Sequence, residues 1–322
     1  MKLMFSIPVH EKLEVVVDQI CNFISLNMDC GIVLHFSQDF NYVDSSINRE
    51  EFNYIIKKIG NIYINPESVR TGPYDIIQSH ISNYKYVKKI TNFQYYCMCA
   101  SNELFIKPGL YDYIRDYDCG VDMTNNTDTN MIWKAGKFAH RDASLKNILS
   151  EIGGDGKIMG SQVEGTFYSE ELFDIICGLI ERHYDWLNMQ EPYAREEVYF
   201  STIIWNLKST RKNIRVSNQG MFTWCPWNRK YTMNVRLHEV KRLIEAESNI
   251  YSVKRVERNN NDCIRAYIRQ KFGYIVNERE LIGSIPVFSN YELQKSEILK
   301  EFRLHANISK KGFKKVMQKL QN

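Results

Sequence analysis

The chain has 322 residues, of which 44% are hydrophobic and 25% charged, and its formal net charge is +4. The length accommodates one large α/β domain with an appendage, or two smaller domains. The net charge is too small to indicate a general nucleic-acid-binding protein. The first residues are not typical of a signal peptide. No apolar run reaches the ~18 residues of a membrane span.

The first hundred residues alternate strand-like and helix-like segments. Residues 2–9 form a short apolar run typical of a strand, and residues 13–26 carry apolar side chains at helical spacing. Residues 31–36 predict a second buried strand. This β-α-β-α-β-α-β rhythm predicts an α/β fold with a mostly parallel sheet flanked by helices. The series continues with helices at 52–59 and 74–87 and with strands at 62–64 and 93–100.

The pattern weakens between residues 116 and 160, which are polar and contain several glycines. We expect long loops there, of the kind that often carry functional residues. Helical periodicity returns at residues 170–184 and 196–207. Short extended stretches follow at 214–216, 221–224 and 250–253, with a helix at 235–247 before the last of them.

Two helical segments, residues 291–304 and 309–320, are predicted at the end of the chain. Residues 294–322 hold eight basic and two acidic residues, a net +6. We therefore divide the chain into a large domain, residues 1–275, and a basic helical C-terminal extension, residues 276–322. The last helix carries an apolar stripe, which suits either an anionic membrane surface or packing onto the domain. The stripe consists of Phe313, Val316, Met317 and Leu320.

The eight cysteines are scattered and include no Cys-x-x-Cys pair, so the sequence predicts no zinc site. Cys97 and Cys99 alternate within an apolar run that is typical of a strand. We interpret the cysteines as reduced thiols that pack as small apolar side chains. This usage indicates a reducing compartment and a cytoplasmic location.

Polar residues follow three of the predicted strands. Ligands of parallel α/β sheets bind at the carboxyl ends of strands, and a nucleoside diphosphate needs cations at its phosphates and an acid or base nearby. Each signal alone has an ordinary structural explanation, such as a hydrogen-bonded histidine or a solvated Lys-Arg pair. The residues are His35 and Ser37 after the second strand, Ser101 and Glu103 after the fourth, and Lys254, Arg255 and Arg258 after the late strand.

The order of these motifs along the chain is informative. MKLMFSIPVHEK, IVLHFSQD, SVRTGPYDII and YYCMCASNELFIK succeed one another in the first half, and MGSQVEGTFYSEELFDII, AREEVYFSTII and IYSVKRV in the second. This series resembles the core-2/I-branching β-1,6-N-acetylglucosaminyltransferases and peptide-O-xylosyltransferases, glycosyltransferase family fourteen, over about residues 2–269. The resemblance implies a GT-A-like fold and transfer of GlcNAc or a related sugar from a UDP-sugar to a glycan.

The resemblance also assigns roles to residues. It implies that Glu197 is the catalytic base, with Glu196 in reserve, and that Lys254 binds the phosphates beside Arg255 and Arg258. Only one of two adjacent helical residues can face the site, because they point ~100° apart. The remaining implied residues are His35, Ser37, Arg70 and Gly72 near the base, Ser101 and Glu103 near the donor sugar, and Gln162 and Glu164 near the acceptor.

Several residues depart from the family pattern. Glu103 stands where the family has Asp, Phe105 where it has Pro, and Val163 where it has Trp. The cysteines that form disulfides in the family are not reproduced, which suits a bacterial cytoplasmic relative. These departures bear on the donor and acceptor sugars more than on the reaction type.

We expect the reaction to be inverting and independent of metal or any cofactor besides the UDP-sugar substrate. Asp116-Tyr117-Asp118 follows a predicted helix and not a strand, so we expect it in a loop and not at a metal site. Cationic side chains would then stabilise the departing UDP. The predicted role is surface polysaccharide or lipopolysaccharide synthesis, and a lipid-linked acceptor would suit docking of the tail at the inner face of the plasma membrane.

A second class of function stays open from the sequence. The α/β domain could be a non-catalytic nucleotide-sugar sensor or scaffold, with the basic tail as a module that binds a partner or a membrane. Release of UDP from a UDP-sugar separates the two classes, because a scaffold releases none.

Overall fold

The computed structural model describes residues 1–41, 45–71, 76–123, 125–127, 132–185, 192–211, 213–217, 219–226 and 234–274. The predicted extension, residues 276–322, lies outside these residues, so its two helices and the domain boundary at residue 275 stay predictions. Gly72 also lies outside them.

A six-stranded sheet lies at the centre of the described residues, in the order β3-β2-β1-β4-β9-β6. β1 pairs in parallel with both β2 and β4, and β2 pairs in parallel with β3. β9 joins β4 and β6 in antiparallel pairs. The expected α/β fold with a mostly parallel, helix-flanked sheet is thus confirmed. The strands are β1 (Leu3–Val9), β2 (Cys30–Phe36), β3 (Ile62–Ile64), β4 (Tyr95–Met98), β6 (Cys119–Gly120) and β9 (Phe167–Ser169).

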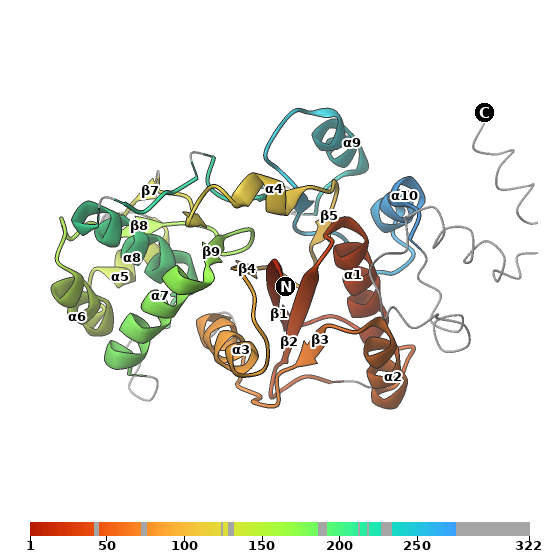
Figure 1. Cartoon of the computed structure of the whole chain (residues 1–322), viewed down its shortest axis with the longest axis horizontal. Helices are drawn as coiled ribbons and strands as arrows, with labels where there is room; N and C mark the ends of the chain where they lie inside the picture. Colours follow the sequence, from red (N-terminus) through yellow and green to blue (C-terminus); the bar gives the residue numbers. More distant parts are fainter. Residues whose placement is uncertain are drawn as a thin grey trace, which may run out of the picture.

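Helices cover both faces of this sheet (Figure 1). Alternate residues of a strand point to opposite faces, so in β1 Met4 packs in one apolar cluster and Phe5 in another. The cluster around Phe5 includes α1 (Leu13–Leu26) and α2 (Arg49–Ile59). The cluster around Met4 includes α3 (Ile76–Ile90), α7 (Glu170–His183) and α8 (Glu196–Thr210).

The segment between residues 116 and 160 is more regular than the sequence predicts. It contains α5 (Lys134–Ala139) and α6 (Ala143–Ile152), and β7 (Asn125–Asn126) pairs with β8 (Met159–Gly160). Asp142 caps α6, since its carboxylate accepts a hydrogen bond from the Leu145 amide at 3.1 Å. α6 packs against α7 and α8. The expectation that this segment forms only loops was wrong, because Asp142 caps a helix there and the apolar residues that follow it have helical spacing.

A small second sheet brings the late strand against the segment after β4. Its order is β10-β11-β5, with β10 parallel and β5 antiparallel to β11. A third apolar cluster lies beneath it and includes Leu104, Val253 and Ile268. The elements are β5 (Leu104–Phe105), α4 (Leu110–Ile114), β10 (Thr223–Trp224), α9 (Leu237–Glu245), β11 (Ser252–Val253) and α10 (Cys263–Phe272).

Candidate functional site

Three glutamates gather around Lys254 just after β11. The Lys254 Nζ lies 2.5 Å from the Glu164 Oε1, and the two side chains are only 19% and 12% exposed. The charge of Glu164 raises the pKa of both Glu196 and Glu197, and the charge of Lys254 lowers both. We call Glu164, Glu196, Glu197 and Lys254 the acid cluster. The structure therefore brings together residues that the sequence assigned to catalysis, to the acceptor and to the phosphates.

The N-terminus of α8 places two of these glutamates. Arg195 precedes the helix, and its Nε lies 3.1 Å from the Asp142 carboxylate, which ties α8 to the cap of α6. The Ser161 amide donates to the Glu197 carbonyl at 2.8 Å, so the segment that carries Glu164 is fixed to the same helix turn. Acidic residues at a helix N-terminus also interact favourably with the helix dipole.

Glu196 and Glu197 differ in burial. Burial raises the pKa of Glu196 to about 8, and its Oε2 is enclosed without a hydrogen-bond partner among the described residues. Glu197 is only partly buried, and burial followed by the charge of Glu164 raises its pKa. The Trp133 side chain donates a hydrogen bond to Glu197 and opposes this rise. Of the two, Glu197 is the carboxylate that solvent and a ligand can reach.

The segment after β11 carries the predicted cations. The Lys254 amide donates to the Trp224 carbonyl at 2.9 Å, which continues the pairing of β11 with β10. Arg255 has φ 66°, an uncommon left-handed conformation for a residue other than glycine, and its Nη1 donates to the Pro226 carbonyl at 2.9 Å. Arg258 Nε lies 3.3 Å from the Glu11 Oε1. The three cations therefore do not converge on one point, since Arg258 points to the end of β1.

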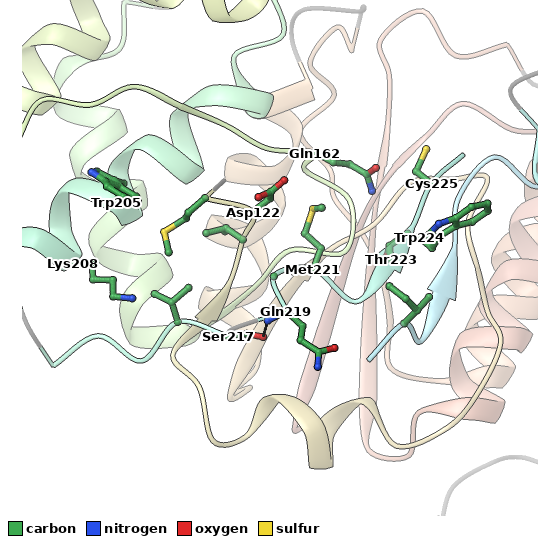
Figure 2. A pocket seen from close by; sticks show the side chains of 15 residues that line it. Asp122, Gln162, Trp205, Lys208, Ser217, Gln219, Met221, Thr223, Trp224 and Cys225 are labelled. Atoms are coloured by element: carbon green, nitrogen blue, oxygen red, sulfur yellow. Dashed lines mark hydrogen bonds between the residues drawn. The ribbon is translucent and has the colours of Figure 1, made fainter. Parts of the chain in front are cut away.

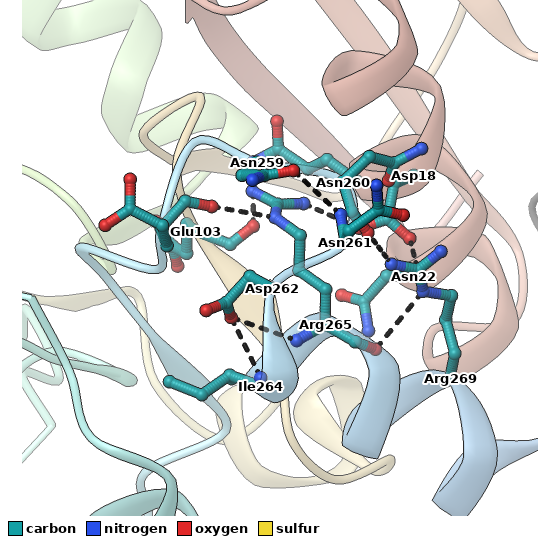
Figure 3. Close-up of polar contacts among 12 residues, drawn as sticks. Asp18, Asn22, Glu103, Asn259, Asn260, Asn261, Asp262, Ile264, Arg265 and Arg269 are labelled. Atoms are coloured by element: carbon teal, nitrogen blue, oxygen red, sulfur yellow. Dashed lines mark hydrogen bonds and ion pairs between the residues drawn. The ribbon is translucent and has the colours of Figure 1, made fainter.

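A buried ion pair supports this segment from below (Figure 3). Arg265 on α10 and Asp18 on α1 are both fully enclosed, with 2.6 Å between Nη1 and Oδ2. Arg265 Nε also donates to the Glu257 carbonyl at 2.9 Å. Arg269, also on α10, lies 3.6 Å from the Asp18 Oδ1 and donates to the Asn260 carbonyl, so two arginines connect residues 254–262 to α1.

The Glu103 side chain is fully enclosed. Its Oε1 accepts hydrogen bonds from Thr223 and Ser252, each at 2.5 Å, and its Oε2 accepts from the Ala100 amide at 3.0 Å. Burial raises the pKa of Glu103 to about 7. Its described contacts join β10, β11 and the segment after β4. The expected contact with a donor sugar stays a prediction.

A second group of residues lies at the carboxyl ends of β1, β2 and β4. The Ser101 hydroxyl donates to the Glu11 Oε1 at 3.1 Å and accepts from the His10 amide at 3.3 Å. Burial lowers the pKa of His10, and the charges of Arg258 and His35 lower it further. We call His10, Glu11, His35, Ser101 and Arg258 the strand-end group. His10 and Glu11 were not predicted from sequence as candidate site residues, although both directly follow the first predicted strand.

His35 and Ser37 hold the segment that follows β3. The Val69 amide donates to the His35 Nε2 at 3.2 Å, and the Thr71 amide donates to the Ser37 Oγ at 3.0 Å. Arg70 pairs with Asp39 at 2.9 Å on the surface. Burial lowers the pKa of His35. The expected contact of His35 with the base stays a prediction.

A pocket of about 660 Å³ lies next to the acid cluster. In Figure 2, Trp224 and Cys225 lie on one side of it and Trp205 and Lys208 on the other, with Asp122 and Met221 between them. Of the residues predicted from sequence, Gln162 lines this pocket. The other lining residues were not predicted from sequence, because they come from segments far apart in the chain.

Within the described residues, no group of three or more His, Cys, Asp or Glu side chains is arranged to hold a metal ion. Asp118 pairs with Arg215 at 2.9 Å. All eight cysteines lie in described segments and are free thiols, and no described helix has the length and apolar character to cross a membrane.

No family model matches the chain, so the resemblance to glycosyltransferase family fourteen stays a prediction. The chain is similar to the chondroitin synthase of Pasteurella multocida (strain Pm70), with 24% identity over 260 residues. These residues are 75% of this chain and 25% of that protein, so the chain spans about a quarter of the length of that relative.

Two solved structures of LgtC also resemble the chain. One is the galactosyltransferase LgtC in complex with donor and acceptor sugar analogues, with 12% identity and a TM-score of 0.39. The other is an active-site mutant of LgtC, with 11% identity and a TM-score of 0.40. In both cases the match covers 89% of this chain and 98% of the other.

Proposed function

We propose that the chain is a glycosyltransferase with a GT-A-like fold that moves a sugar from a UDP-sugar to a glycan acceptor. The acid cluster is the observation that carries this proposal. It sets a reachable carboxylate, Glu197, close to a largely buried lysine, Lys254, at the carboxyl end of a strand. The similarity of three quarters of the chain to a chondroitin synthase supports the same reaction class.

In the proposed reaction, Glu197 accepts the proton of an acceptor hydroxyl as its oxygen attacks the anomeric carbon. The bond from that carbon to the diphosphate oxygen breaks, and UDP leaves with the electron pair. The transition state resembles an oxocarbenium ion, and a single displacement inverts the anomeric centre. General base catalysis of this kind contributes about 10²–10⁴-fold.

The departing UDP gains negative charge, which must be stabilised where it develops. Lys254 and Arg255 are the proposed cations, and the strand-end group, including His35, is the proposed site of the nucleotide. Ligands of parallel sheets bind at these strand ends, which supports this placement. The donor is proposed to be UDP-GlcNAc or a related UDP-sugar.

Glu197→Gln tests the proposal. We expect UDP release in the presence of acceptor to fall at least ~10²-fold while UDP binding is retained, because the variant removes the base and not the cations. Glu171→Gln is the matched control, since Glu171 is exposed and holds the same position in α7, the second residue of the helix, that Glu197 holds in α8. A Glu197→Gln enzyme as active as the control would show that Glu197 only stabilises the start of α8. A protein that binds UDP-sugars but turns none over would instead be a sensor or scaffold.

A further inference from the structure

The pocket is connected to the acid cluster on two sides. Gln162 lines it and donates from Nε2 to the Glu164 carbonyl at 2.8 Å. Trp224 lines it as well, and its carbonyl accepts the Lys254 amide at 2.9 Å. The pocket therefore adjoins the two segments that carry Glu164 and Lys254.

We propose that this pocket binds the terminal sugar rings of a neutral acceptor saccharide. The inference rests on the proposed function and deepens it by naming the substrate class of the acceptor side. The pocket volume of about 660 Å³ is typical of sites for small organic ligands, which span about 300–1,000 Å³, so it is large enough for an oligosaccharide end.

The lining has the two kinds of surface that a pyranose needs. A sugar ring has apolar C–H faces and a rim of hydroxyl groups, so it packs against aromatic rings and hydrogen-bonds to amides and carboxylates. Trp205 and Trp224 supply aromatic surface at opposite sides of the pocket, and Gln162, Gln219 and Asp122 supply polar groups (Figure 2).

Trp205 is fixed in its orientation. Its indole Nε1 donates to both carboxylate oxygens of Asp155, at 2.9 and 3.0 Å, and the Lys157 ammonium lies 4.9 Å from the centre of the ring. Because the Trp205 side chain is already ordered, it loses little conformational entropy when a ligand binds.

The charge of the lining distinguishes an acceptor from a donor. Among the described residues that line the pocket, Asp122 is the one acid and Lys208 the one base. Lys254, Arg255 and Arg258 are not among these described residues, so this part of the lining does not supply the cationic clamp that a diphosphate requires. A polyanionic glycan would meet a lining without net charge. The pocket therefore suits an uncharged saccharide.

Binding of simple glycosides to the full chain tests this assignment without catalysis. The probes are the methyl β-glycosides of glucose, galactose, N-acetylglucosamine and N-acetylgalactosamine. UDP serves as the donor-side ligand. Binding is measured by saturation-transfer NMR and titration calorimetry. We expect at least one glycoside to bind, and Trp224→Ala to weaken it about tenfold, equivalent to about 1.4 kcal/mol. Trp224→Phe should retain most of the binding, and UDP affinity should not change. Tyr54→Ala, which removes an exposed aromatic ring on α2, is the control.

Three results would overturn the assignment: no glycoside binds, Trp224→Ala binds as the parent chain does, or UDP competes with the glycoside. These outcomes differ from failure of the proposed function. If Glu197→Gln abolishes UDP release but Trp224→Ala leaves glycoside affinity unchanged, the proposed reaction is supported and the pocket assignment is wrong. If glycosides bind through Trp224 and no UDP-sugar is turned over, the pocket is a saccharide site on a protein that is not a transferase.

Discussion

Glu197 shares its electrostatic environment with Glu164 and Lys254. Burial makes the largest contribution to its raised pKa, and the charge of Glu164 makes the next. A general base acts in its ionised form, so turnover should rise with pH through the pKa of Glu197. Because that pKa is raised, the rise should occur above the ordinary value of 4.5.

Glu164→Gln tests this coupling. Removing a like charge favours ionised Glu197, and it also releases Lys254 from its pair, which acts in the same direction. We therefore expect the acidic limb of the kcat profile to move to lower pH in this variant. The measurement is kcat at saturating donor and acceptor between about pH 4 and pH 9. A limb that stays in place or moves upward would contradict the assigned role of Glu197.

Lys254 is the residue proposed to take the place of a divalent metal. A fixed ammonium that is mostly withdrawn from solvent attracts a diphosphate more strongly than an exposed lysine does, because the screening by water is weaker. We expect turnover to persist in excess EDTA. We also expect the Lys254→Ala substitution to weaken the affinity for UDP at least ~10-fold. Loss of activity in chelator that Mn²⁺ or Mg²⁺ restores would show that the reaction needs a metal. An exposed lysine, Lys271, is the matched control for the affinity measurement.

At the scale of elements, Arg265 on α10 connects α1 to the segment between β11 and α10. Its guanidinium satisfies Asp18 on α1 and the Glu257 carbonyl at once, a geometry that the single ammonium of lysine cannot reproduce. Arg265→Lys keeps the charge opposite Asp18 but loses the second contact. A variant that removes the charge altogether would leave the buried Asp18 with only the longer contact to Arg269, at 3.6 Å, and loss of a partner from a buried ion pair is strongly destabilising.

We expect Arg265→Lys to raise the KM for the donor several-fold with a smaller effect on kcat, because the segment that carries the cations becomes less well ordered. Steady-state kinetics with the donor varied would measure this. Arg265→Met should lower the melting temperature more than Arg265→Lys does. If both variants lose stability and neither changes the KM, the ion pair supports only the fold.

At the scale of the whole molecule, the candidate site joins the two ends of the described chain. Apart from Arg258, the strand-end group follows strands of the first hundred residues. The acid cluster combines Glu164, which lies between β8 and β9, with the start of α8 and the segment after β11. The pocket extends from Trp205 on α8 to Trp224 on β10 (Figure 2). Donor and acceptor would therefore approach the cluster from different groups of elements.

The basic extension, residues 276–322, bears on where the molecule acts. We expect a chain truncated after Lys310 to lose binding to anionic liposomes and to keep turnover on a soluble acceptor, since each lysine near an anionic surface contributes about 1 kcal/mol. Co-sedimentation with liposomes, with and without anionic lipid, measures this. Unchanged liposome binding, or unfolding of the truncated chain, would favour packing of the tail onto the domain.

The strands and helices of the first hundred residues could be predicted closely from sequence. The boundaries of α1 and β3 were correct as predicted, because α1 has the apolar periodicity of an amphipathic helix and β3 consists of three consecutive apolar residues. β6 and β9 were missed, since neither forms an apolar run that stands out from its polar neighbours in sequence. Those two strands set the antiparallel edge of the sheet, and their pairing depends on contacts distant in sequence.

For the site, the residue order by itself determined which side chains were candidates, and the tertiary structure decided where each one lies. Glu164, Glu197 and Lys254 belong to separate motifs, and only the tertiary structure brings them together. Glu103 looked equivalent to Ser101 in sequence, yet it is enclosed by Thr223 and Ser252. Burial and charge proximity depend on the whole fold, whereas a local pattern records only chemical type and spacing.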